Sequence, residues 1–217
     1  MNEWDERALE WEMPTLRDAP RLPIVVEVGG FEGRWVSQMA ERYVARFVVF
    51  EPQTWAHERL RERVLPVLRS SASLTIHPYG LGLQAEQRPM GGWGTDACSF
   101  LLNEHYYAEH PEEGRRDVGT GQLVAVQSAF ERNGFDEVDV MMMNCEGFEF
   151  VILPEMLRLD YVRRVRNLAV QFHNAHDPDG SMQRSLRKQI GETHDVRFDF
   201  GSTLTAVDSA VNRAAAT

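Results

Sequence analysis

Two glutamates frame a glycine-rich turn near the start of the chain. Glu27 comes just before the turn, and Glu51 ends the next apolar run along the sequence. The glycines of the turn are Gly29, Gly30 and Gly33. This order is typical of a buried parallel strand, a turn that opens a helix, and a second buried strand. Because a carboxylate is costly to bury unpaired, we expect Glu51 to serve a ligand in a nucleoside-binding crevice at these two strand ends.

The glycine spacing indicates which nucleoside this is. A dinucleotide site needs G-x-G-x-x-G so that the backbone can approach the pyrophosphate, but Phe31 and Arg34 replace its second and third glycines. Glu27 and Glu32 would also repel a pyrophosphate. They suit a ligand with a cationic amino-acid end, and Glu51 suits ribose hydroxyls, which together describe S-adenosylmethionine (SAM). The other expected cofactor contacts are Pro52, Gly80, Leu81 and Asn144.

Three residues beyond later strands could assist methyl transfer. A hydroxyl acceptor needs a proton acceptor as well as alignment with the methyl group. Glu146 and His173 come just after apolar runs, where ligands bind in such sheets. We expect one of them to be the base and Asn144 to position the acceptor or the methionine end of SAM. Glu149 is expected to be structural, orienting the helix of Glu146 or pairing with an arginine.

A divalent metal is an alternative that the sequence does not favour. Asn144, Glu146, His173, His176 and Asp177 could supply nitrogen and oxygen ligands. Two histidines after one strand end are expected to point in different directions, however, and the residues from Asp177 onward are ordinary turn formers.

Apolar periodicity alternates between strand and helix along the chain. The expected strands are 24–28, 46–51, 74–77, 123–126, 138–144 and 167–172. The expected helices are 33–44, 54–69, 128–133, 145–159 and 181–192. Two further runs, at 196–200 and 203–207, predict a terminal antiparallel β-hairpin. The pattern therefore predicts an α/β fold with a mostly parallel central sheet and helices on both faces.

Two segments fall outside this alternation. Residues 1–22 predict an amphipathic helix that could act as a lid or as a homodimer contact. Residues 84–121 are rich in glycine, proline and charge, and we expect an irregular, poorly ordered insertion that recognises the substrate.

Length and charge limit the remaining choices. A chain of 217 residues is expected to form a single domain, residues 1–217. The chain has a net charge of −10 and lacks the basic clusters that nucleic-acid binding requires. No apolar run reaches the roughly 20 residues needed to span a membrane. With two widely separated cysteines and no signal-peptide pattern, the chain is expected to be cytoplasmic.

The motifs resemble those of one enzyme family. Residues 138–149, followed by Val151, Ile152 and Leu153, are similar to the signature I-D-L-L-K-I-D-V-E-G-x-E-x-x-V-L of FkbM-type methyltransferases. Residues 48–52 resemble that family's V-x-A-F-E-P, and residues 169–173 its strand ending in E-x-H. The resemblance implies the Rossmann-like class I methyltransferase fold. It also implies SAM-dependent transfer to a hydroxyl of a sugar, polyketide or other small metabolite, with S-adenosylhomocysteine as product.

Some positions depart from that signature, and they keep other functions open. Met142 replaces a lysine and Asn144 an aspartate, so a strand-end carboxylate is lost. Methylation of an amine tolerates this change, because an amine needs a weaker base. A catalytically degenerate SAM-binding protein is another alternative, and an oxidoreductase using NAD or a nucleotide-sugar is a third, weakened by Phe31 and Arg34.

Overall fold

The computed structural model describes residues 20–93, 97–101, 116–173 and 176–209, together with Leu16 and Ala108. The predicted N-terminal helix and its role as a lid or dimer contact lie almost wholly outside this part of the chain. The single domain across residues 1–217 stays a prediction.

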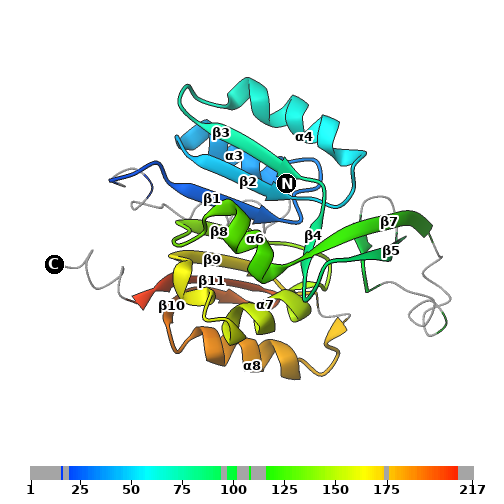
Figure 1. The fold of residues 1–217 in the computed structure, drawn as a ribbon. Helices are drawn as coiled ribbons and strands as arrows, with labels where there is room; N and C mark the ends of the chain where they lie inside the picture. The colour runs from blue at the N-terminus through cyan, green and yellow to red at the C-terminus, as the bar shows by residue number, and fades with distance from the viewer. Residues whose placement is uncertain are drawn as a thin grey trace.

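The central element is a seven-stranded sheet in the order β10-β11-β9-β8-β1-β2-β3 (Figure 1). Its strands are β1 (Ile24–Val28), β2 (Arg46–Phe50), β3 (Ser73–His77), β8 (Val140–Met143), β9 (Asn167–Gln171), β10 (His194–Phe200) and β11 (Thr203–Asp208). The strands from β9 to β3 are parallel. β11 is antiparallel to both β9 and β10. The predicted mostly parallel sheet and its terminal hairpin are therefore confirmed.

Helices cover both faces of this sheet. They are α3 (Arg34–Arg42), α4 (Ala56–Val64), α6 (Val126–Asn133), α7 (Glu149–Arg158) and α8 (Ser181–Ile190), with short 3₁₀ turns at Leu65–Val67 and Val162–Arg164. Successive strand residues point to opposite faces, and both faces are apolar, which explains the nearly continuous hydrophobic strands. Val25 and Met142 pack with α3 and α4. Val26 and Met141 pack with α6, α7 and α8.

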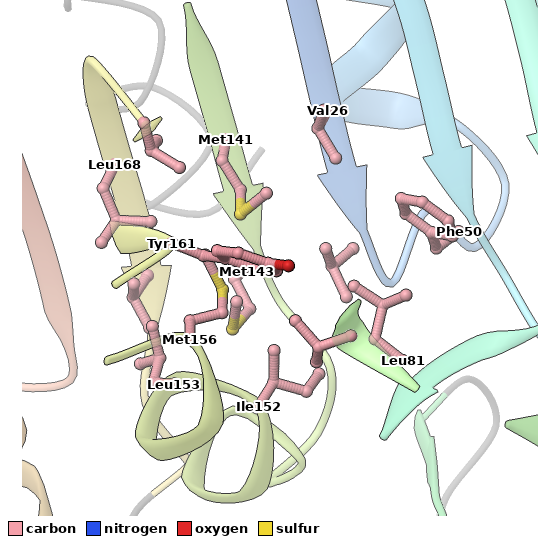
Figure 2. Close-up of a cluster of buried hydrophobic side chains, with 14 of the residues drawn as sticks. Val26, Phe50, Leu81, Met141, Met143, Ile152, Leu153, Met156, Tyr161 and Leu168 are labelled. Atoms are coloured by element: carbon pink, nitrogen blue, oxygen red, sulfur yellow. The ribbon is translucent and has the colours of Figure 1, made fainter. Parts of the chain in front are cut away.

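The face covered by α7 carries a methionine-rich core. Figure 2 shows Met141 and Met143 of β8 lying between the strands and α7, where they meet Ile152 and Met156. This packing holds the end of β8 in place, directly before the turn at residues 144–148.

A smaller sheet is the main departure from the predicted fold. It joins β4 (Gly80–Gly82), β5 (Glu86–Trp93), β6 (Ala97–Ser99) and β7 (Arg116–Ala125) in the order β4-β7-β5-β6. The prediction of an irregular 84–121 segment is therefore wrong for its described residues. The strand β5 is not recognisable from the sequence, because Glu86 to Pro89 are polar or proline residues that are exposed or partly exposed. Its partner strand β7 lies about 30 positions further along the chain.

The topology places a crevice at the carboxyl ends of β1 and β8. The chain leaves β1 toward β2 and β3 on one side, and later returns to β8 on the other side of β1. Such a switch point is where open α/β sheets bind ligands. The smaller sheet lies beyond these strand ends (Figure 1). Among the described residues, no helix has the length and apolar character that crossing a membrane requires.

Candidate active site

A pocket of about 350 Å³ opens at this switch point. It collects side chains and backbone from the ends of β1, β2 and β8, from the smaller sheet and from α7. The predicted site residues that line it are Glu27, Gly29, Gly30, Glu51, Pro52, Gly80, Leu81, Asn144 and Glu146. Gly33 and His173 are not among the lining residues.

The turn after β1 approaches the end of β8 so closely that only glycine fits. Gly29 has a φ of 85°, and a Cβ atom there would lie 1.9 Å from the backbone oxygen of Asn144. Gly33 has a packing role, and its predicted cofactor contact stays a prediction. A Cβ atom at Gly33 would lie 2.8 Å from Leu60 Cγ, so this glycine allows α3 to pack against α4.

Glu51 is held rigidly at the floor of the crevice and is 2% exposed. The backbone N–H groups of Phe31 and Gln53 donate to its two carboxylate oxygens, each at 2.7 Å. Burial raises the pKa of Glu51 to about 7, although these two backbone hydrogen bonds oppose the shift. Each oxygen retains a lone pair for a ligand. That this ligand is a ribose stays a prediction.

Glu27 is a buried carboxylate with one unpaired oxygen. It is 5% exposed, and its Oε2 atom has no hydrogen-bond partner among the described residues. Burial, followed by repulsion from Glu51, raises the pKa of Glu27 well above its usual range. Two other residues that line the pocket also carry a buried polar atom without a partner in the described chain, namely Trp35 Nε1 and Asn144 Oδ1. Native proteins rarely leave such groups unpaired, so the three atoms indicate a polar ligand.

These unpaired atoms suit a ligand that carries both an ammonium group and a carboxylate. Glu27 and Asn144 offer oxygen acceptors, which suit an ammonium group. Trp35 offers only a donor, which suits a carboxylate. Trp35 is one of several apolar residues in the helix predicted at 33–44, and nothing in its spacing distinguishes it from the others.

A chain of three titratable residues follows β8 and β9. Glu146 lines the pocket with its side chain 26% exposed, and its Oε2 atom lies 3.3 Å from His173 Nε2. On the other side of the ring, His173 Nδ1 lies 3.0 Å from Glu149 Oε1. Glu149 is fully buried and also accepts the backbone N–H groups of Gly147 and His173, at 2.9 and 2.6 Å. It thus holds the turn before α7, and its ion-pair partner is His173 and not the arginine that one alternative predicted.

His173 is poorly suited to the predicted role of general base. Burial alone lowers its pKa, but the hydrogen bonds to Glu146 and Glu149, together with their charges, outweigh burial and raise the pKa to about 10. The imidazole therefore carries its proton at neutral pH and cannot accept another. His173 also lies outside the pocket lining. Of the three residues Glu146, His173 and Glu149, only Glu146 lines the pocket.

The residues considered for a metal site are used differently. Asp177 accepts the backbone N–H groups of Met182 and Gln183, at 3.1 and 2.7 Å, at the start of α8. His176 packs on Gly147, where its Cδ2 atom would meet a Cβ at 2.1 Å. The described residues contain no group of three or more His, Cys, Asp or Glu side chains placed to hold a metal ion.

The smaller sheet supplies much of the pocket wall, and most of these residues were not predicted from the sequence. Met90, Cys98, Ser99 and Phe100 line the pocket, as does Phe148 at the start of α7. The short apolar run at residues 97–102 was the one available signal. Predicted substrate recognition by this segment stays a prediction.

The sequence matches no family model and no curated protein. Among solved structures, it is similar to the methyltransferase FkbM from Methylobacillus flagellatus KT, with a TM-score of 0.54 and 14% identity over 94% of this chain. Monomeric WbdD gives a TM-score of 0.51 with 12% identity over 95% of this chain. A Klebsiella pneumoniae protein described as an O-methyltransferase gives 0.50 with 11% identity over 96% of this chain and 82% of its own.

This chain spans 50% of the FkbM structure and 41% of WbdD. The comparisons show the fold, which is that of the class I methyltransferases and of FkbM in particular.

Proposed function

We propose that this chain is a SAM-dependent methyltransferase that transfers a methyl group to a hydroxyl of a small molecule. The observation that carries the proposal is the set of unpaired buried atoms on Glu27, Trp35 and Asn144, which line one pocket together with Glu51. In a class I methyltransferase fold, a pocket with this chemistry at the switch point suits the amino-acid and ribose ends of SAM.

Each part of the pocket would bind a different part of the cofactor. Glu51 would accept from the ribose hydroxyls, and Glu27 would receive the ammonium group. The backbone of Gly29 and Gly30 would lie against the amino-acid moiety. SAM itself supplies an activated methyl group, so the protein must mainly align the acceptor and exclude water.

Glu146 is the residue placed to take the acceptor proton. As the acceptor oxygen forms its bond to the methyl carbon and the carbon–sulfur bond breaks, the hydroxyl proton would pass to the Glu146 carboxylate. His173 and Glu149 are positioning residues in this scheme, because they hold Glu146 by the contacts at 3.3 and 3.0 Å. Asn144, which lines the same pocket, would orient the acceptor or the methionine end of SAM.

One observation favours a second candidate, methylation of an amine. One oxygen of the Glu146 carboxylate is already occupied by the protonated His173, and a hydroxyl depends on a free proton acceptor more than an amine does. An amine needs less help. The net charge of −10 favours a small molecule over a nucleic acid in either case, and a cytoplasmic location and dimerisation through the N-terminal helix stay proposals.

Calorimetry with S-adenosylhomocysteine, NAD and UDP-glucose tests the proposal. We expect saturable binding of S-adenosylhomocysteine alone. Glu27→Gln should weaken it about ten-fold or more, because a charge-assisted hydrogen bond typically contributes about 1.5–3 kcal/mol. Glu155→Gln is a matched control, since Glu155 pairs with Arg158 on α7 and does not line the pocket. Binding of NAD or UDP-glucose in place of S-adenosylhomocysteine would refute the proposal.

A further inference from the structure

Part of the pocket has a chemistry that the cofactor contacts do not use. This part is lined by Met90, Cys98, Ser99, Phe100, Phe148 and Ile152. All of them except Cys98 are buried. The rings of Phe100 and Phe148 lie 5.4 Å apart and are tilted by 53°. We call these six residues the aromatic wall.

The aromatic wall is built into the smaller sheet. A Cβ atom at Gly121 would lie 2.4 Å from Met90 Sδ and 2.7 Å from Phe100 Cζ, so only a glycine in β7 lets these two side chains rest on the strand. Phe148 is held from the other side at the start of α7. The wall is therefore formed before a ligand arrives, as in most small-molecule sites.

The aromatic wall offers few hydrogen-bonding groups. Ser99 Oγ already accepts the backbone N–H of Leu101 at 3.0 Å. Among the polar residues that line the pocket, Asn144 and Glu146 follow β8 and come just before Phe148 of the wall. A sugar would bring several hydroxyls against apolar side chains, and each one left without a partner would lower affinity roughly ten-fold.

We propose that the methyl acceptor is a phenol: a flat, apolar aromatic molecule with its hydroxyl directed at Asn144 and Glu146. The inference rests on the proposed function and specifies its substrate class. In the transfer, the phenolic oxygen forms a bond to the methyl carbon as the carbon–sulfur bond of SAM breaks, and the phenolic proton passes to Glu146.

The acid–base cluster independently favours a phenol over an aliphatic hydroxyl. A phenol ionises near pH 10, as tyrosine does, whereas an aliphatic hydroxyl resembles water and has a far higher pKa. The Glu146 carboxylate already accepts from the protonated His173. A carboxylate held in this way can assist the first of these ionisations far more readily than the second.

Calorimetry on the complex with S-adenosylhomocysteine tests this inference, with 2-naphthol as the aromatic probe and methyl α-D-glucopyranoside as the sugar probe. Phe148→Leu removes one ring of the wall. Phe150→Leu is the matched control, because Phe150 is equally buried on the same helix but packs on Phe172, outside the pocket. We expect 2-naphthol to bind and the glucoside not to bind. Phe148→Leu should weaken 2-naphthol roughly five-fold, and Phe150→Leu should change it less than two-fold.

The other outcomes separate this inference from the proposed function. If S-adenosylhomocysteine binds but 2-naphthol does not, or the glucoside binds in preference, the phenol assignment is overturned and the proposed function stands. Equal effects of the two phenylalanine variants would overturn it as well. If Phe148→Leu loses affinity for S-adenosylhomocysteine and Phe150→Leu does not, this ring lies against adenine. The phenol assignment is then overturned as well. Failure of S-adenosylhomocysteine to bind the wild-type chain would overturn both.

Discussion

Raising the pH from 6 to 8 should tighten the binding of S-adenosylhomocysteine by about ten-fold through Glu51. In the cofactor-free chain, burial raises the pKa of this carboxyl to about 7. Ribose hydroxyls donate to a carboxylate and so favour its charged form. Binding must therefore release a proton from Glu51 whenever the pH lies below about 7, and this release weakens binding at low pH.

The magnitude follows from the free protein's titration. With a pKa of about 7 in the free chain and full ionisation in the complex, the apparent dissociation constant rises by a factor of 1 + 10^(pKa − pH). That factor is about 11 at pH 6 and about 1.1 at pH 8, which gives the ten-fold difference. Glu27, whose pKa is also raised, would add to the effect in the same direction, so ten-fold is a lower bound.

Isothermal titration calorimetry at pH 6 and 8 measures both affinity and proton release. Glu51→Gln should bind more weakly and lose about ten-fold of the pH dependence. Glu32→Gln is the control, because Glu32 also lines the pocket but is paired with Arg59 and Arg63. It should keep the full pH dependence. A dissociation constant that changes less than two-fold in the wild type between these pH values would refute the placement of the ribose on Glu51.

Two further predictions concern the turns that carry the site. Gly29→Ala should lower the free energy of unfolding by about 3 kcal/mol or more, because the new Cβ would clash with the Asn144 backbone oxygen at a φ of 85°. Gly134→Ala also has a positive φ but open space around its Cβ, so urea unfolding should show a loss of only about 1 kcal/mol, and equal losses would contradict the close approach. Glu149→Gln should bring the pKa of His173 down from about 10 toward its ordinary range, because one of two flanking carboxylates is lost. NMR titration of the imidazole would follow this change, and a pKa still near 10 would show that Glu146 alone sustains it.

The cofactor side of the site was largely predictable because its residues belong to one β-α-β unit. The expected strand at 24–28 is β1 to the residue, and the strand at 46–51 is β2 with Glu51 just beyond it. Strands buried on both faces show continuous apolar runs, and a turn between them leaves a clear glycine signal. Gly33 packs α3 against α4, which the sequence could not show because a glycine that packs two helices and one that lines a pocket look alike in sequence.

The acceptor side was not predictable, because its residues meet only through pairing of distant segments. β5 contains Glu86, Gln87, Arg88 and Pro89, and it acquires strand geometry by pairing with β7. Local propensity carries little information about such a ribbon. The orientation of His173 was hidden for a related reason: its position after β9 was correct, but the direction of its ring depends on Glu149 from another element.

The two strained residues that line the pocket show how the fold holds the site open. Phe31 and Glu146 both have a positive φ, at 43° and 53°, a conformation that costs of order 1–3 kcal/mol in a residue with a side chain. A buried glutamate stabilises each turn. Glu51, beyond β2, accepts the N–H of Phe31, and Glu149 accepts the N–H of Gly147, directly after Glu146.

The same two glutamates also connect neighbouring strand ends. Glu51 joins the turn after β1 to the end of β2, and Glu149 joins the turn after β8 to the end of β9 through the His173 N–H. Hydrogen bonds between neighbouring strand ends therefore stabilise each strained turn before any ligand binds. Glu51 lines the pocket and Glu149 does not. A substitution at Glu51 should therefore affect binding directly. A substitution at Glu149 should act only by moving Glu146 and His173, which is the distinction between a binding residue and a positioning residue at this site.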